Sequence, residues 1–206
     1  MQRLWIKICG LRTAAAIEAA AKAGTDAVGF VFHEPSPRNL PLDAARELQR
    51  AVPPGVERVA VFLHPSQALV DAVLELIAPD WLQLDVADLA SLRLPDGQRV
   101  LPVLRSGDGI PQPPPARCLF ESARSGMGEA ADWQAAGQLS RQTQVVLAGG
   151  LHPANVAVAV SEVRPFGVDV SSGVERERGV KDAKLIREFI QAARAAERAL
   201  PVEESR

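Results

Sequence analysis

Apolar segments of strand length alternate with helix-like segments along nearly the whole of this 206-residue chain. The apolar segments are continuous runs of Val, Ile, Leu and Phe rather than alternations of polar and apolar residues. Continuous runs are typical of parallel strands that are covered on both faces. Eight such segments occur, at residues 4–9, 26–32, 57–63, 81–85, 99–104, 117–121, 144–149 and 166–170.

Helix-like segments follow most of the predicted strands. They span residues 14–24, 42–52, 66–78, 130–140, 153–163 and 182–200, with a weaker one at 86–94. Ser66 is a suitable N-cap for the third of these. Residues 105–116 are an exception, because prolines at 111 and 113–115 are incompatible with a helix interior. The sequence therefore predicts that the helix after the fifth strand is missing or degenerate.

Eight strand–helix units favour a compact α/β fold, a single (β/α)₈ barrel, which can be formed by as few as about 200 residues. An open doubly wound sheet is the alternative, but it usually has fewer strands and a glycine-rich first turn. The turn "CGLRTA", residues 9–14, lacks that pattern. No domain boundary is visible, so we predict one catalytic domain over residues 1–200 and a frayed tail at 201–206.

Composition and charge exclude several classes of binding partner. The formal net charge is −2, which gives no bulk attraction to nucleic acid or to an anionic membrane. No apolar run approaches membrane-span length, and no signal peptide is visible. Cys9 and Cys118 have no zinc spacing, and neither do His33, His64 and His152. We expect a cytoplasmic protein with no metal and no nucleic-acid or membrane partner.

Polar residues gather where the predicted strands end. In a (β/α)₈ barrel the C-terminal ends of the strands form the active-site mouth. The polar or glycine positions at these ends are Cys9, Arg38, His64, Asp85, Arg105, Glu121, Gly149, Gly150, Asp169 and Ser171–Gly173.

The turns after the seventh and eighth strands predict a phosphate site. Gly149 and Gly150 end "LAGG", and Ser172 and Gly173 follow "DVS". Small residues let backbone N–H groups approach an anion, and barrels frequently bind phosphate at these two loops. The alternative is that both are merely tight turns, but their occurrence together favours phosphate.

Cys9 has two interpretations. Most free cysteines are small buried hydrophobic residues, and Cys118 fits that description. Cys9, however, ends a strand and shares a strand face with Lys7, whose charge would lower the thiol pKa. Glu121 directly follows "CLF" and is either a solvated loop carboxylate or a group within the mouth. A thiolate and a carboxylic acid can act as general base and general acid.

The chain resembles the phosphoribosylanthranilate isomerase family of tryptophan biosynthesis. The motifs that carry the resemblance are "KICG", "AGTDAVGFVF", "SPR", "VAVFLHPS", "LAGGLHPANV", "GVDVSSGVE" and "GVKD". They occur in the family's order and cover the chain from Lys7 to about Ile190.

The resemblance implies a cofactor-free Amadori rearrangement. The substrate, N-(5-phosphoribosyl)anthranilate, becomes 1-(2-carboxyphenylamino)-1-deoxyribulose 5-phosphate. A general acid protonates the ribose ring oxygen, the ring opens to a Schiff base, and a general base removes the C2 proton. The enolamine then tautomerises to the ketone.

The resemblance also assigns residues. Cys9 would be the base and Glu121 the acid, where the family has an aspartate. Arg38 would bind the anthranilate carboxylate, for which a guanidinium is suited. Asp169 would contact the central polar groups of the substrate. Apart from the resemblance, we also expect Lys7 to contact the substrate. The expected partner is this small phosphorylated molecule, and the expected assembly is a monomer or a homodimer.

Besides Glu121, two single positions and one loop depart from the family pattern. Asp85 and Val86 stand where the family commonly has "HG", and "SGMG" at 125–128 replaces a "GGTG" loop. Asp85 would repel an anionic aromatic acid unless it is paired, for instance with Arg105; alternatively it points to solvent. These departures leave open a related aminoaldose or sugar-phosphate isomerase, or a non-catalytic phosphate-binding relative.

Overall fold

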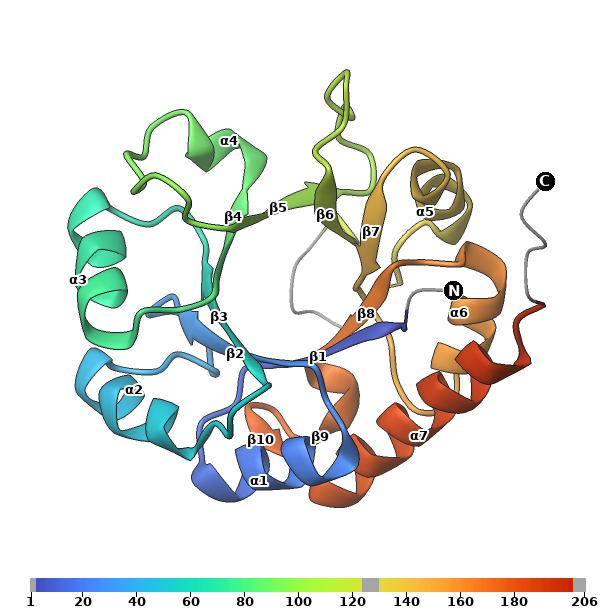
Figure 1. Ribbon diagram of the computed structural model, residues 1–206, viewed down its shortest axis with the longest axis horizontal. Coiled ribbons are helices and arrows are strands. Elements are labelled where there is room, and N and C mark those ends of the chain that lie inside the picture. The colour runs from blue at the N-terminus through green and yellow to red at the C-terminus, as the bar shows by residue number, and fades with distance from the viewer. Residues whose placement is uncertain (1–2, 124–129, 202–206) are drawn as a thin grey trace.

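Eight parallel strands close into a barrel in the computed structural model, which describes residues 3–123 and 130–201. The strands follow one another in chain order, and β1 pairs with both β2 and β8 (Figure 1). The predicted barrel is confirmed, and closure excludes the open sheet. The strands are β1 (Trp5–Cys9), β2 (Ala27–Phe32), β3 (Glu57–Phe62), β4 (Trp81–Asp85), β5 (Val100–Arg105), β6 (Arg117–Glu121), β7 (Gln144–Leu147) and β8 (Gly167–Val170).

Helices surround the barrel (Figure 1). Side-chain caps fix several starts: the Ser66 hydroxyl accepts a hydrogen bond from Leu69 N, as the sequence predicts, and Thr13 and Asp182 cap their helices similarly. The helices are α1 (Ala14–Ala23), α2 (Leu42–Leu48), α3 (Gln67–Ile77), α4 (Val86–Leu89), α5 (Trp133–Ser140), α6 (Val156–Val163) and α7 (Ala183–Ala199), with 3₁₀ turns η1 (Gln49–Ala51) and η2 (Ser172–Val174).

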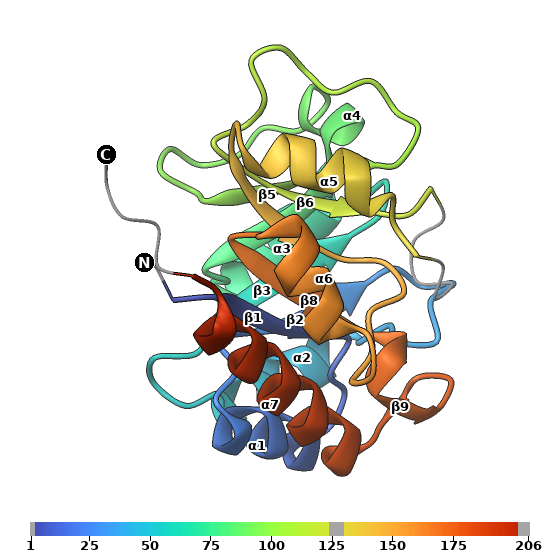
Figure 2. The same cartoon turned by 90° about the vertical axis from the view of Figure 1, so that its right-hand side faces the viewer.

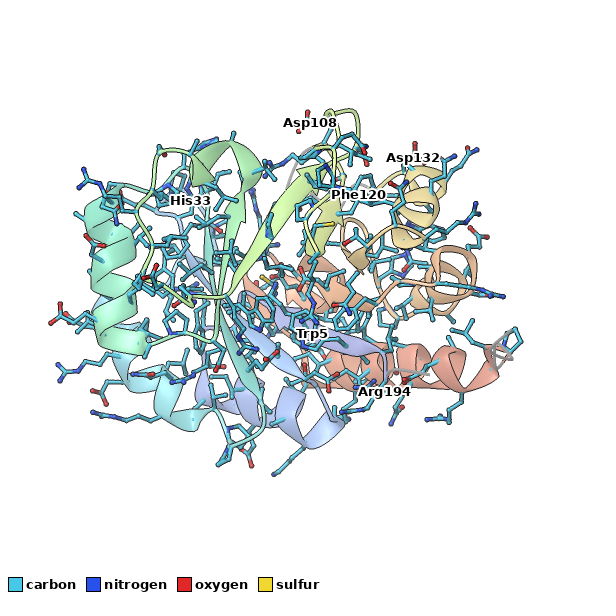
Figure 3. The ribbon with its side chains drawn as sticks, turned by 45° about the horizontal axis from the view of Figure 1, so that its top comes forward. Trp5, His33, Asp108, Phe120, Asp132 and Arg194 are labelled. Carbon is cyan, nitrogen blue, oxygen red and sulfur yellow. The ribbon has the colours of Figure 1, made fainter. Side chains whose placement is uncertain are left out.

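The connection between β5 and β6 contains no helix, and all of residues 106–116 are described. This confirms the prediction from the prolines. The connection runs outward as an irregular loop, with Asp108 far from the barrel axis and Phe120 back within β6 (Figure 3).

The hydrophobic core has two parts. The larger part lies between the strands and the helices and includes Ile8 and Phe30 with Phe189 of α7. The smaller part fills the barrel interior with side chains such as Val59 and Leu119. This division follows from the alternation of side chains along each strand.

A short hairpin follows β8 and was not predicted. Strand β9 (Glu175–Glu177) pairs antiparallel with β10 (Val180–Lys181). The hairpin lies at the carboxyl end of the barrel (Figure 2). Helices α1 and α7 run side by side along the outside of the barrel. The turn residue Gly179 has a φ of +84°, and an added Cβ would lie 2.7 Å from the carbonyl oxygen of Pro37. The hairpin thus packs closely on the β2–α2 loop.

Among the described residues, no helix combines the length and apolar character needed to cross a membrane. The single domain over residues 1–200 stays a prediction. Most of the predicted tail, residues 202–206, lies outside the described residues.

Candidate active site

A cavity of about 260 Å³ opens at the C-terminal ends of the strands. Strands or loops from around the barrel contribute the charged and nucleophilic groups of its wall. These include Cys9, Arg38, Asp85, Arg105, Glu121, Asp169 and Arg178. The structure therefore brings together most of the polar positions that the sequence places at strand ends. His64 is different, because its side chain is 70% exposed and bonded to Asp88 outside this wall.

Lys7 has 0% exposure and does not itself line this cavity, but it contacts two residues that do. Its ammonium group donates to Asp169 Oδ1 at 2.8 Å and to Gln83 Oε1 at 2.9 Å, so it spans the interior from β1 to β8 and β4. Burial alone would lower the pKa of Lys7, but Asp169 and the nearby Cys9 outweigh it and raise that pKa. Lys7 is therefore a permanent cation beneath the cavity.

Cys9 is buried beside Lys7, as strand alternation predicts. Burial raises the pKa of the Cys9 thiol, Lys7 opposes that rise, and Asp169 adds to it. The expectation that Lys7 would bring this thiol below its usual pKa was wrong, because loss of solvent outweighs the cation. A thiolate formed at this position would be a stronger base than an ordinary cysteine thiolate, because the pKa of its conjugate acid is raised. Cys118 packs in the larger part of the hydrophobic core, outside the cavity wall, and burial raises its pKa to about 11.

Gly29 sits opposite Cys9 in the β1–β2 register. A Cβ at this position would lie 2.9 Å from Cys9 Sγ and 3.1 Å from Lys7 Cε. The absence of a side chain is therefore what leaves room for the thiol. Sequence reasoning missed Gly29, although a glycine inside a strand often marks a close approach of this kind.

Arg38 is held by an acidic residue that sequence reasoning also missed. Its Nε and Nη2 donate to the two carboxylate oxygens of Glu175 at 2.7 and 2.8 Å, and Lys181 Nζ lies 2.7 Å from Glu175 Oε1. Burial alone would raise the pKa of Glu175, but the Arg38 and Lys181 hydrogen bonds lower it to about 2. The unpredicted hairpin supplies both Glu175 and Lys181 and fixes Arg38 at the rim.

Asp85 is buried and paired, so the alternative in which it points to solvent is wrong. Its Oδ1 lies 2.7 Å from Arg105 Nη1, the partner that the sequence suggested. Arg105 Nη2 also lies 3.3 Å from Glu121 Oε1. Glu121 is only 9% exposed, which places it in the wall and not on a solvated loop.

The predicted phosphate residues line a smaller pocket next to the cavity. Gly149, Gly150 and Ser172 contribute to its wall. Both glycines have positive φ, +87° and +64°, which glycine adopts without strain. Gly173 packs on the β7 loop, since an added Cβ would lie 1.9 Å from the Leu151 carbonyl oxygen. The pocket is therefore shaped by small residues from both loops, although its ligand stays a prediction.

One group of side chains has an arrangement that could hold a cation. Ligand atoms of His64, Asp85 and Asp88 lie within 4.8 Å of one another. Asp85 is engaged by Arg105, and Asp88 accepts from the His64 backbone and lies 2.9 Å from its ring.

The "SGMG" segment, residues 125–128, which departs from the family pattern, lies outside the described residues.

Comparison with known proteins by sequence and by structure finds the same family. The family model for N-(5'phosphoribosyl)anthranilate (PRA) isomerase matches residues 6–192. The N-(5'-phosphoribosyl)anthranilate isomerase of Rhodopseudomonas palustris is 39% identical over 210 residues, covering 93% of this chain and 96% of its own. That of Thiobacillus denitrificans is 38% identical over 205 residues, covering 93% and 98%.

Solved structures agree. TrpF from Jonesia denitrificans has a TM-score of 0.79 with 34% identity and covers 95% of this chain and 98% of its own. Phosphoribosyl anthranilate isomerase from Thermotoga maritima has a TM-score of 0.78 with 30% identity, covering 94% and 100%. A further Thermotoga maritima structure is described as monomers of a dimeric enzyme. With both sequence and fold matched over almost its whole length, the chain belongs to the N-(5'-phosphoribosyl)anthranilate isomerase family.

Proposed function

We propose that this chain isomerises N-(5-phosphoribosyl)anthranilate to 1-(2-carboxyphenylamino)-1-deoxyribulose 5-phosphate in tryptophan biosynthesis. The observation that carries the proposal is one cavity with Cys9 and Glu121 in its wall, next to a small pocket lined by Gly149, Gly150 and Ser172. The named relatives support the same reaction and give no support to the alternatives of another specificity or a retired site.

The substrate would lie across the mouth. Its phosphate would enter the pocket of Gly149, Gly150 and Ser172, with Gly173 holding the two loops together, where backbone N–H groups can bind an anion. At the other end, Arg38 would take the anthranilate carboxylate. The Glu175 bridge engages Nε and Nη2 of Arg38 and so orients its guanidinium for that task.

Chemistry would take place between the two anchors. Glu121 protonates the ring oxygen and the C1–O bond breaks, giving a Schiff base. The Cys9 thiolate then removes the C2 proton, and the electron pair moves into the C1–C2 bond of the enolamine. Burial favours the neutral thiol that this step forms, while Lys7 stabilises the thiolate that precedes it. Asp169 lines the cavity and can contact the substrate's central hydroxyls, whereas the proposed contact of Lys7 with the substrate would need its fully buried ammonium group to become accessible.

Further expectations follow from the same proposal. The reaction requires proton transfers only, so we propose that it needs no cofactor and no metal. We also propose a cytoplasmic enzyme without a nucleic-acid or membrane partner. A monomer or a homodimer is proposed for its assembly, which sedimentation in solution would decide.

The test is the loss of fluorescence of freshly generated phosphoribosylanthranilate. Wild type should turn over, and Cys9→Ser and Glu121→Gln should each lose about 10²–10⁴-fold in kcat. Cys118→Ser and Glu162→Gln are matched controls outside the cavity and should retain activity if folded. No turnover by folded wild type would contradict the proposal. Turnover that survives Glu121→Gln would move the acid role to Asp169.

A further inference from the structure

Arg105 occupies a position between two carboxylates of neighbouring strands. Its Nη1 lies 2.7 Å from Asp85 Oδ1, on β4, and its Nη2 lies 3.3 Å from Glu121 Oε1, on β6. Each terminal nitrogen of one planar guanidinium thus has its own carboxylate. The three side chains are 7%, 18% and 12% exposed for Asp85, Arg105 and Glu121 respectively, so solvent screens their interaction little.

The barrel register produces this arrangement. Arg105 pairs directly with Glu121 between β5 and β6, whereas Asp85 pairs with Val103, two residues before Arg105. Two residues restore the same strand face, so the Arg105 side chain stands on the inward face one step above Asp85. From there the fork of the guanidinium reaches back to Asp85 and sideways to Glu121.

We propose that Arg105 is a positioning residue for the general acid Glu121 and that Asp85 in turn orients Arg105. The inference rests on the proposed function. A glutamate has one more rotatable bond than an aspartate, so its carboxyl group has more positions to explore. Contact with Arg105 restricts those positions to ones that face the cavity.

The contact between Asp85 and Arg105 makes it possible for Glu121 to act as a general acid beside Arg105. A guanidinium beside a lone carboxyl group favours the ionised form, which cannot donate a proton. Here Asp85 takes the shorter contact and balances the charge of Arg105.

An alternative role for Arg105 is direct binding of the substrate carboxylate, since it also lines the cavity. The two roles differ in kinetics. A positioning residue acts through Glu121 and affects kcat, whereas a binding residue raises KM. The role of Arg105 can therefore be measured separately from the role of Arg38.

The experiment compares kcat and KM of wild type, Arg105→Gln, Arg105→Lys, Asp85→Asn, Glu121→Gln and the double variant Arg105→Gln/Glu121→Gln. Arg93→Gln, an exposed arginine of the β4–β5 connection, is the matched loss of charge outside the cavity. Circular dichroism and thermal unfolding establish that each variant is folded. If Arg105→Gln does not fold, Asp85→Asn and Arg105→Lys carry the test.

We expect Arg105→Gln to lower kcat by about 10–100-fold with KM changed less than about threefold, as displacement of a reacting group does. Arg105→Lys should recover part of the loss, because it keeps the charge but not the fork. Asp85→Asn should also lower kcat. In the Glu121→Gln background, Arg105→Gln should add less than about twofold, because residues that act through one group are not additive.

Three results would overturn the inference while leaving the proposed function in place. They are a raised KM with unchanged kcat in Arg105→Gln, full activity in that variant, or losses that multiply in the double variant. Absence of turnover in folded wild type would instead contradict the proposed function, and this inference with it.

Discussion

The two ends of the barrel carry the same kinds of charged side chain in different settings. At the N-terminal end, Arg99 lies 4.4 Å from the ring centroid of Trp81 and Arg117 lies 4.0 Å from that of Phe166. Trp5, which Figure 3 places on β1, donates its indole N–H to Glu57. These contacts pair guanidinium groups with aromatic faces and stabilise the end of the barrel.

At the C-terminal end, charged groups border a cavity instead. The Lys7–Asp169, Arg38–Glu175 and Asp85–Arg105 pairs are ion pairs, as Arg99–Glu57 is at the other end, but each of the three has at least one member in the wall of a cavity that a ligand can enter. A buried ion pair alone therefore does not indicate function. Its position beside a cavity at the carboxyl ends of the strands does.

The largest effect should come from Asp169→Asn. It leaves Lys7, which is fully buried, without its anionic partner, and breaking such a pair destabilises a protein by about 3–5 kcal/mol. Urea unfolding measures the loss. Adding Lys7→Met should recover most of the stability but none of the activity. Recovery of activity in the double variant would show that the pair only supports the fold.

Glu175→Gln should cost about 3 kcal/mol at neutral pH, because it removes the anion shared by Arg38 and Lys181. The pKa of Glu175 falls from 4.5 to about 2 on folding, so its contribution is complete above 4.5 and disappears as the pH drops through about 2. Urea unfolding of both proteins at decreasing pH should show their stabilities converging over this range. A difference that is independent of pH would contradict the account.

Gly29→Ala should displace Cys9 and Lys7 at the active-site end of the barrel. The new methyl group would lie 2.9 Å from Cys9 Sγ, and overpacking of this kind costs about 1–3 kcal/mol. Displacement of Cys9 should lower kcat more than it raises KM. Gly109→Ala, where an added Cβ meets nothing within 4 Å, is the matched control. Equal kcat values for the two variants would show that Cys9 tolerates displacement or does not act as the base.

Arg99→Gln at the opposite end should have the smallest effect. It removes the contact with Trp81 and the 2.9 Å ion pair with Glu57, and its side chain is 47% exposed. We expect a loss of about 1 kcal/mol in the free energy of unfolding and unchanged kcat and KM. A reduced kcat in a folded protein would mean that the two ends are coupled.

The barrel could be predicted from the sequence, because the apolar strands, the capped helices and the missing helix at 105–116 are each determined by residues close together in the chain. The sequence also placed Cys9, Asp85 and Glu121 at one mouth, since a closed parallel barrel brings strand ends together. It could not provide the Glu175–Lys181 hairpin, whose polar strands lack apolar patterning. Nor could the sequence predict that the pKa of Cys9 is raised, because that depends on burial in the folded protein. It also could not predict that Arg105 contacts carboxylates on two different strands.

The most direct test of the central claim is a crystal structure with reduced 1-(o-carboxyphenylamino)-1-deoxyribulose 5-phosphate, a compound present in one solved relative. The account predicts phosphate at Gly149, Gly150 and Ser172, the carboxylate at Arg38, and the sugar chain between Cys9 and Glu121. A ligand bound in the reverse direction, or outside the C-terminal mouth, would contradict it.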